Sequence, residues 1–239
     1  MNLFRIPIVL ISFLVITIDG YAQLNARPPL FRHLGMDEGL TEQVITDIHR
    51  DHLGFMWFST QGGLNKYDGY RFTTYTYDAS DTNSLSDNFV HRFIEAKNGL
   101  LWIGTYAGGL NSFDPRTNKF RRYTHNSEDS LSIGSNDVRT IAESKDGKIF
   151  AGTFDAGMYE LDPATGKIKS HRYDPKDTTS FPLITVWALM FDSRGNLWVS
   201  GNGKIKGTFK IDLKSGTSEF IHGIVAQKIL EDKTCRIWL

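Results

Sequence analysis

Short apolar runs alternate with polar, glycine-rich joints along most of the chain, as in the runs Phe55–Phe58 and Leu100–Ile103. The runs are rich in aromatic and β-branched residues, which suit a pleated and half-buried surface. The joints are rich in Asp, Asn, Ser and Gly, the residues that form tight turns. After residue 23 no stretch places apolar residues at the 3.6-residue period of a helix. The pattern therefore predicts an all-β chain with almost no helix.

One pattern recurs along the chain at a nearly constant interval. Its most visible member is an aromatic residue inside an apolar run, at positions Trp57, Trp102, Phe150, Trp198 and Trp238. The intervals are 45, 48, 48 and 40 residues. A period of this length is the signature of a repeat architecture, and chance does not explain so many recurrences.

Each copy contains four short segments with strand character. The first leads into an Asp-x-x-Gly or Lys-Asp-Gly turn, the second carries the aromatic residue, the third follows a glycine pair, and the fourth resembles Phe-x-x-Tyr. Four strands in ~40–50 residues are the unit of a β-propeller blade. A β-solenoid has shorter periods, so we predict an all-β β-propeller with four complete four-stranded blades and part of a fifth, in an incomplete ring. The blades are expected at about 39–75, 84–123, 130–173, 180–222 and, in part, 224–239.

Most of the recurring residues have a structural explanation. A Trp side chain buries ~150–250 Å², so we expect the aromatic series to pack between neighbouring blades. The recurring Asp and Gly residues are expected to shape turns. Cys235 is the single cysteine and excludes an intrachain disulfide; we expect it to be a small buried apolar residue.

The N-terminal residues differ from the rest of the chain. Arg5 precedes an apolar stretch over residues 6–18, and Gly20-Tyr21-Ala22 forms a small-x-small sequence. This is the layout of a secretory signal peptide, and the stretch is shorter than the ~20 residues that a membrane-spanning helix needs. We predict that residues 1–22 are a signal peptide cleaved after Ala22 and that residues 23–239 are exported as the propeller.

The charge balance and the absence of known motifs argue against several classes of function. Lys and Arg together number 27, as do Asp and Glu, so no basic field favours nucleic acid as a partner of this segment. The chain has no Gly-x-Ser-x-Gly, His-Glu-x-x-His or phosphate-loop motif. The seven histidines are scattered without metal-ligand spacing. We therefore predict no catalytic residues, no metal and no cofactor, although two carboxylates converging from different blades could still support a glycosidase.

The repeats resemble a known family, the two-component regulator propeller repeats. The resemblance rests on Leu101–Thr105 followed by Gly108–Asn111, on Asp51–Trp57 followed by Gly63–Gly69, and on Phe31–Leu34 with Asp37–Leu40. It covers about residues 29–239. It implies a periplasmic sensor that binds oligosaccharides, within a dimeric parent protein whose downstream blades and histidine kinase module are not in this chain.

The sequence stops within the second strand of a fifth blade, which predicts a fragment of a longer product. Residues 30–34 resemble the fourth strand of a blade and are expected to close the ring by completing a last blade. Because unclosed blades expose sheet edges and apolar surface, we expect this chain alone to be poorly soluble or partly unfolded. A monomeric sample with a cooperative melting transition would contradict this.

Ligand-binding residues are expected where the repeat varies. The connections between second and third strands, and between blades, share one face of a propeller. Aromatic faces stack on sugars, whereas amides and carboxylates bond hydroxyl groups. The candidates are the loop residues Gln61, Tyr106, Phe154, Asp155 and Asn202, together with Trp187 and His91 on first strands.

Three further functions remain open at this stage. The chain could belong to an enzyme that acts on glycans, which requires activity on a polysaccharide that is lost when one carboxylate is replaced. It could be a scaffold or adhesin, which requires protein partners and no affinity for sugars. It could also be an inactive fragment.

Overall fold

The computed structural model describes residues 31–129, 131–177, 180–213, 215 and 217–239. The chain divides into two units, Met1–Leu34 and Gly35–Leu239. The predicted signal peptide lies outside the described residues. Of the first unit only residues 31–34 are described, and they form no strand; Phe31 is 91% exposed. A strand needs a partner edge, and no described residue pairs with this segment, so its role in closing a ring stays a prediction.

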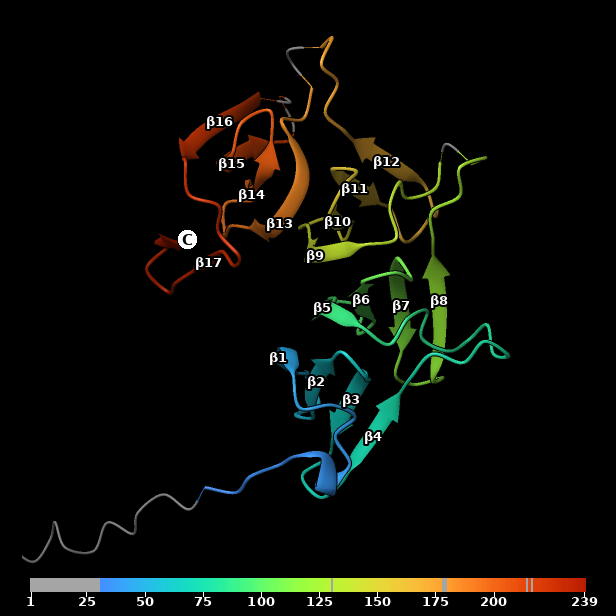
Figure 1. Ribbon diagram of the computed structural model, residues 1–239. Helices are drawn as coiled ribbons and strands as arrows, with labels where there is room; N and C mark the ends of the chain where they lie inside the picture. The colour runs from blue at the N-terminus through green and yellow to red at the C-terminus, as the bar shows by residue number, and fades with distance from the viewer. Residues whose placement is uncertain (1–30, 130, 178–179, 214, 216) are drawn as a thin grey trace, which may run out of the picture. The chain divides into compact units, whose positions relative to one another are not determined.

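The second unit is built from four antiparallel four-stranded sheets and a two-stranded one, counted over the described residues (Figure 1). The predicted all-β fold is confirmed. The helix content is a single three-residue 3-10 helix, Met36–Glu38, within the described ranges. The described strands form no closed ring.

Each sheet corresponds to one predicted blade, and its strands follow one another in chain order. Blade 1 contains β1 (Ile45–Arg50), β2 (Met56–Thr60), β3 (Gly63–Tyr67) and β4 (Phe72–Tyr75). Blade 2 contains β5 (Val90–Glu95), β6 (Leu101–Thr105), β7 (Leu110–Asp114) and β8 (Lys119–Tyr123). Blade 3 contains β9 (Val138–Glu143), β10 (Ile149–Thr153), β11 (Met158–Leu161) and β12 (Ile168–His171).

The last two blades follow the same order. Blade 4 contains β13 (Leu183–Phe191), β14 (Leu197–Gly203), β15 (Gly207–Asp212) and β16 (Thr217–His222). Blade 5 is represented by β17 (Leu230–Glu231) and β18 (Ile237–Trp238). First strands of neighbouring blades contact one another, β1 with β5, β5 with β9 and β9 with β13 (Figure 1).

The first three members of the aromatic series pack between blades, as predicted. Trp57, Trp102 and Phe150 are each at most 1% exposed. Trp57 of blade 1 meets Phe113 of blade 2 edge to face at a centroid distance of 6.0 Å. In the last described blades the side chains are less covered, and Trp238 is 55% exposed. Each fully buried Trp removes ~150–250 Å² from water, so these contacts are a main source of cohesion between blades.

Two local predictions are wrong. Cys235 is exposed rather than buried. It occupies the last position of the turn between β17 and β18 with φ of 59°, where the side chain projects from a hairpin tip. Asn202 lies within β14 and not in a loop, because β13 begins at Leu183 and pairs Thr185 with Asn202.

Candidate functional site

In the first strand of every complete blade one equivalent residue bulges out of the ladder, and β13 has a second register shift between Leu183 and Thr185. The pairing of β5 with β6 passes from Val90–Thr105 to Arg92–Gly104 and leaves His91 as an extra residue. The equivalent register shift makes Arg139 the extra residue in β9 and Trp187 the extra residue in β13. In blade 1 the corresponding residue is Thr46. A β-bulge re-aims the side chain of its extra residue, so the fold presents four equivalent side chains from four first strands.

Three of these bulge residues belong to one cluster. The Arg139 guanidinium lies over the rings of Phe154, at 4.8 Å from its centroid, and Trp187, at 5.2 Å. It also lies 5.9 Å from the ring of Tyr106. The ring of His91 meets that of Tyr106 at 5.9 Å. We call this set the bulge cluster: Phe89, His91, Tyr106, Asp137, Arg139, Phe154 and Trp187.

The aromatic members contact one another as well as the arginine. Phe89 stacks on Tyr106 at 5.6 Å and contacts His91 at 4.7 Å. Phe154 meets Trp187 edge to face at 5.9 Å. Tyr106 is 51% exposed and Phe154 is 42% exposed. The cluster therefore combines aromatic surface open to solvent with a charged centre, contributed by blades 2, 3 and 4.

Asp137 holds the charged centre together. Its Oδ1 lies 2.7 Å from Nε of Arg139 and 3.2 Å from Nε2 of His91. A second guanidinium nitrogen of Arg139 donates to Oδ2 at 2.7 Å. Burial acts to raise the pKa of Asp137, but the contacts with His91 and Arg139 outweigh it and hold that pKa below its ordinary value. Asp137 is thus an anion that hydrogen-bonds Arg139 and lies within ion-pair distance of His91.

The loops that carry Tyr106 and Phe154 are held in the same way in both blades. Thr105 donates from Oγ1 to the Gly109 carbonyl at 2.9 Å, and the Tyr106 N–H donates to the Phe89 carbonyl at 3.0 Å. Thr153 and Phe154 make the equivalent bonds in blade 3, at 2.8 and 3.0 Å. The repeated threonine therefore positions the aromatic residue that follows it.

The predicted site residues divide into two groups. Tyr106, Phe154, Trp187 and His91 come together in the bulge cluster. Gln61, Asp155 and Asn202 make no hydrogen bond or ion pair with the cluster among the described residues.

Sequence reasoning missed the polar centre, Asp137 and Arg139, and also Phe89. A signal for Arg139 was present, because it follows the repeated valine of the first strand, as His91 and Trp187 do. Comparing these positions across the repeats would have found it.

No group of three or more His, Cys, Asp or Glu side chains in the described part of the chain gathers as a metal site. Within the same residues, no helix has the length and apolar character needed to span a bilayer. The bulge cluster contains aromatic faces, a guanidinium, an imidazole and a carboxylate, which are groups that can stack on or hydrogen-bond to a ligand.

Comparison with known proteins places these repeats in a family. Residues 84–107 and 180–203 match the model of the family described as two component regulator propeller. These two segments are two-component regulator propeller repeats. The matched segments lead into and include the first two strands of blades 2 and 4, so they contain His91, Tyr106, Trp187 and Asn202.

Two solved structures are similar to this chain. The extracellular domain assigned to the hybrid two component system BT3049 of B. thetaiotaomicron is 29% identical, with a TM-score of 0.77. The match covers 88% of this chain and 29% of that domain. Virginiamycin B lyase from Staphylococcus aureus matches with a TM-score of 0.58 at 14% identity, over 81% of this chain and 62% of the lyase. At that identity the likeness to the lyase shows the propeller fold alone.

The chain is also similar to part of one curated protein. Histidine kinase P4 of Formosa agariphila is 32% identical over 85 residues, which are 36% of this chain and 6% of the kinase. This chain thus spans 29% of the length of the solved extracellular domain and 6% of that of the kinase.

Proposed function

We propose that this chain is an extracellular ligand-sensing segment of a two-component sensor and that its ligand is an oligosaccharide bound at the bulge cluster. The observation that carries the proposal is the arrangement of Arg139 among the rings of Tyr106, Phe154 and Trp187. Aromatic faces stack on the C–H faces of sugar rings, and oriented guanidinium, imidazole and carboxylate groups bond hydroxyls. These are the few well-placed polar groups within an aromatic lining that ligand sites use.

The role as a sensor is supported by the extracellular domain of the hybrid two component system and by the histidine kinase that the chain resembles. We propose that the first 22 residues direct export to the periplasm. We further propose that the parent protein supplies more blades and a kinase module, works as a dimer, and that these blades bind their ligand without turning it over.

Binding of oligosaccharides by the intact protein tests the proposal. A glycan array should yield one class of oligosaccharide, whose affinity is then measured by titration calorimetry. Tyr106→Ala and Phe154→Ala should each weaken binding about tenfold or more, because stacked rings are typical binding hot spots. Tyr70→Ala is the matched control, since Tyr70 is a 90% exposed aromatic residue on the turn between β3 and β4.

Three results would overturn this function. One is the absence of affinity for any glycan. Another is affinity that Tyr106→Ala and Phe154→Ala leave unchanged. The third is release of shorter sugars from the bound ligand, which would indicate an enzyme.

A further inference from the structure

The space between blades 3 and 4 departs from the packing used between the earlier blades. In blade 1, Tyr75 of the fourth strand stacks on Trp57 at 5.7 Å, and in blade 2 Tyr123 lies on Trp102 at 5.6 Å. Blade 3 has smaller residues at both positions, Phe150 and His171, with ring centroids 6.4 Å apart. The register confirms the equivalence, because Tyr75, Tyr123 and His171 pair with Leu64, Leu110 and Met158 at the same ladder position.

On the facing side of blade 4, one side chain that lines the space is also smaller than in the earlier blades. The fourth strands of blades 2 and 3 place Phe120 and Ile168 against the preceding blade, opposite Phe113 and Leu161 in the ladder. The corresponding residue of β16 is Ser218, opposite Ile211. A hydroxymethyl group thus replaces a large apolar side chain.

A hydrogen bond that joins neighbouring blades elsewhere is missing between blades 3 and 4. The glutamate that ends the first strand accepts a backbone N–H from the preceding blade: Glu95 from His52 at 2.9 Å, Glu143 from Lys97 at 3.0 Å, and Glu231 from Ser193 at 2.6 Å. In β13 this position is Phe191, opposite Leu197 as Glu95 is opposite Leu101. An apolar ring therefore stands where the other blades form a polar contact.

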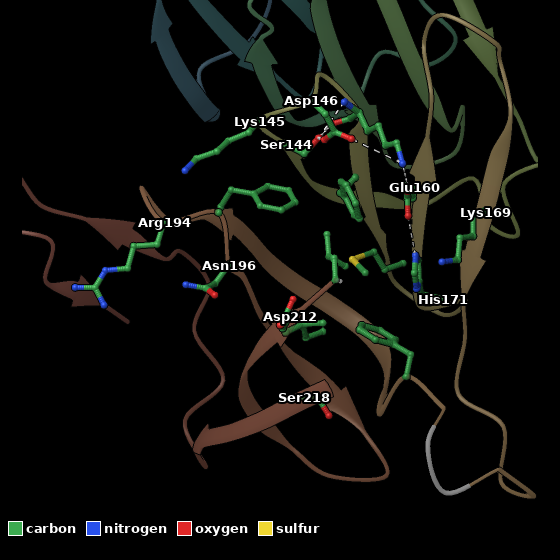
Figure 2. Close-up of a pocket in the computed structure, with 18 of the residues that line it drawn as sticks. Ser144, Lys145, Asp146, Glu160, Lys169, His171, Arg194, Asn196, Asp212 and Ser218 are labelled. Carbon is green, nitrogen blue, oxygen red and sulfur yellow. Dashed lines mark hydrogen bonds and ion pairs between the residues drawn. The ribbon is translucent and has the colours of Figure 1, made fainter. Parts of the chain in front are cut away.

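The four residues at these positions line a pocket of about 880 Å³ between blades 3 and 4 (Figure 2). Its apolar lining includes Phe150, Met158, Phe181, Phe191 and Ile211. Phe150 and Phe191 meet edge to face at 5.1 Å. Ligand pockets typically enclose ~300–1,000 Å³, so the space suits a small organic molecule with a ring.

One wall of the pocket is polar, and contacts between its side chains hold them in position. Glu160 receives a hydrogen bond from Nζ of Lys148 at 2.7 Å and lies 3.3 Å from Nε2 of His171 (Figure 2). Burial acts to raise the pKa of Glu160, but the contacts with Lys148 and His171 outweigh it and lower that pKa. Glu160 is therefore an anion whose charge is balanced by Lys148, and it orients the imidazole of His171.

Lys169 is the cation of this wall that the fold leaves available. Its side chain extends beside His171 (Figure 2), and it makes no ion pair or hydrogen bond among the described residues. Lys145, by contrast, donates to the Ser193 carbonyl at 2.6 Å, and Lys148 is bound to Glu160. A negative group on a ligand would meet the Lys169 ammonium, while the imidazole N–H is directed to Glu160.

We propose that the pocket between blades 3 and 4 is a binding site for a small ring-bearing carboxylate. The ring lies against the apolar lining near Phe150 and Phe191, and the carboxylate is held by Lys169. This site is separate from the bulge cluster, and the proposal does not depend on oligosaccharide sensing.

Three probe molecules distinguish the contribution of the ring from that of the carboxylate charge. They are phenylacetate, its neutral amide phenylacetamide, and acetate. Titration of the intact protein with each, followed by ligand-observed NMR and calorimetry, should show binding of phenylacetate. The amide and acetate should each bind about tenfold more weakly, because one lacks the charge and the other lacks the ring.

Two variants test the location. Lys169→Gln removes the cation, and Ser218→Phe restores the bulky residue of blades 2 and 3 without touching Glu160 or His171. Each should weaken phenylacetate binding about tenfold or more. Arg121→Gln is the control, since Arg121 holds the position of Lys169 in blade 2. A melting temperature equal to or above that of the parent protein shows that the Ser218→Phe variant is folded.

The proposal fails if no probe binds, if phenylacetamide binds as well as phenylacetate, or if Ser218→Phe and Lys169→Gln leave the affinity unchanged. Oligosaccharide binding at the bulge cluster should be unaffected by Ser218→Phe, so the two proposed sites can fail independently.

Discussion

The indole N–H of Trp57 donates to Oδ2 of Asp51 at 2.8 Å, across the hairpin that joins β1 and β2. The same bond joins Trp198 to Asp192 and Trp238 to Asp232, each at 3.0 Å. In blade 2 the position of the aspartate is Ala96, and Nε1 of Trp102 is buried without a hydrogen-bond partner among the described atoms. In blade 3 the pair is Ser144 and Phe150, where no indole needs an acceptor. Blades 1, 4 and 5 thus have both the aspartate and the tryptophan, blade 2 lacks the aspartate, and blade 3 lacks both.

Asp51→Ala should destabilise the protein by about 2–4 kcal/mol, because it leaves the buried indole of Trp57 unpaired and removes the acceptor for two turn N–H groups. Those groups belong to Leu53 and Phe55, at 3.1 and 2.8 Å from Oδ1. Urea unfolding measures the loss. A double-mutant cycle with Trp57→Phe is the control, and a coupling energy near zero would contradict the assigned bond.

Ala96→Asp should stabilise the protein by about 1 kcal/mol, because the new carboxylate gives the buried Trp102 an acceptor. The turn at Ala96 already has the backbone hydrogen bonds of the turn at Asp51. The matched control is Ser144→Asp in blade 3, where Phe150 offers no donor and a buried carboxylate should be neutral or destabilising. Urea unfolding of the three proteins decides between these outcomes, and equal effects of the two substitutions would disprove the explanation.

Stability should fall as the pH drops below about 6.5, in part because of His171. Burial lowers the pKa of His171 below its ordinary value of 6.5, the nearby Glu160 acts to raise it, and Lys169 lowers it further. The folded protein therefore binds this proton less readily than the unfolded chain, so the contribution is fully present above pH 6.5 and is lost as the pH falls toward the folded-state pKa.

The variant His171→Tyr restores the aromatic residue of blades 1 and 2 and removes this titration. Urea unfolding at pH 8 and pH 5.5 should show a smaller drop in stability for the variant than for the parent protein. Parallel drops would show that His171 takes no part in the pH dependence.

Cys235→Gly should stabilise the hairpin of blade 5 by about 1 kcal/mol, because a left-handed backbone strains a residue with a side chain. Cys235 has φ of 59°, and the other blades have glycine at this turn position, at Gly54, Gly99, Gly147 and Gly195, with φ from 80° to 94°. Hydrogen exchange of the amides in β17 and β18 should slow in the variant. Cys235→Ala keeps the strain and should leave the exchange rates unchanged.

Much of the fold was predictable because each blade is a local structure. Strand, turn and strand follow one another within a few residues, so the alternation of apolar and polar positions and the turn residues determine the hairpins. The repeated aromatic also indicated inter-blade packing, since a side chain as large as that of Trp57 has to be covered by another blade. The turn with Cys235 was misjudged because residue type alone does not reveal an exposed hairpin tip.

The candidate site could be predicted only in part. Tyr106, Phe154, His91 and Trp187 stood out as departures from the repeat at positions where blades vary. Their convergence around Arg139 depends on bulges in three strands and on the spacing of three blades, and neither is visible in a single repeat. The pocket beside His171 depends likewise on residues from two blades that are 47 positions apart, such as His171 and Ser218.

The sequence by itself determined the blades, because short-range turn geometry and the two-residue period of strands act within a few neighbouring residues. The tertiary structure alone decided which side chains meet between blades. Packing of one sheet on the next joins residues about 45 positions apart, and only this packing turned Phe150, His171, Phe191 and Ser218, each a small departure from the repeat, into one pocket.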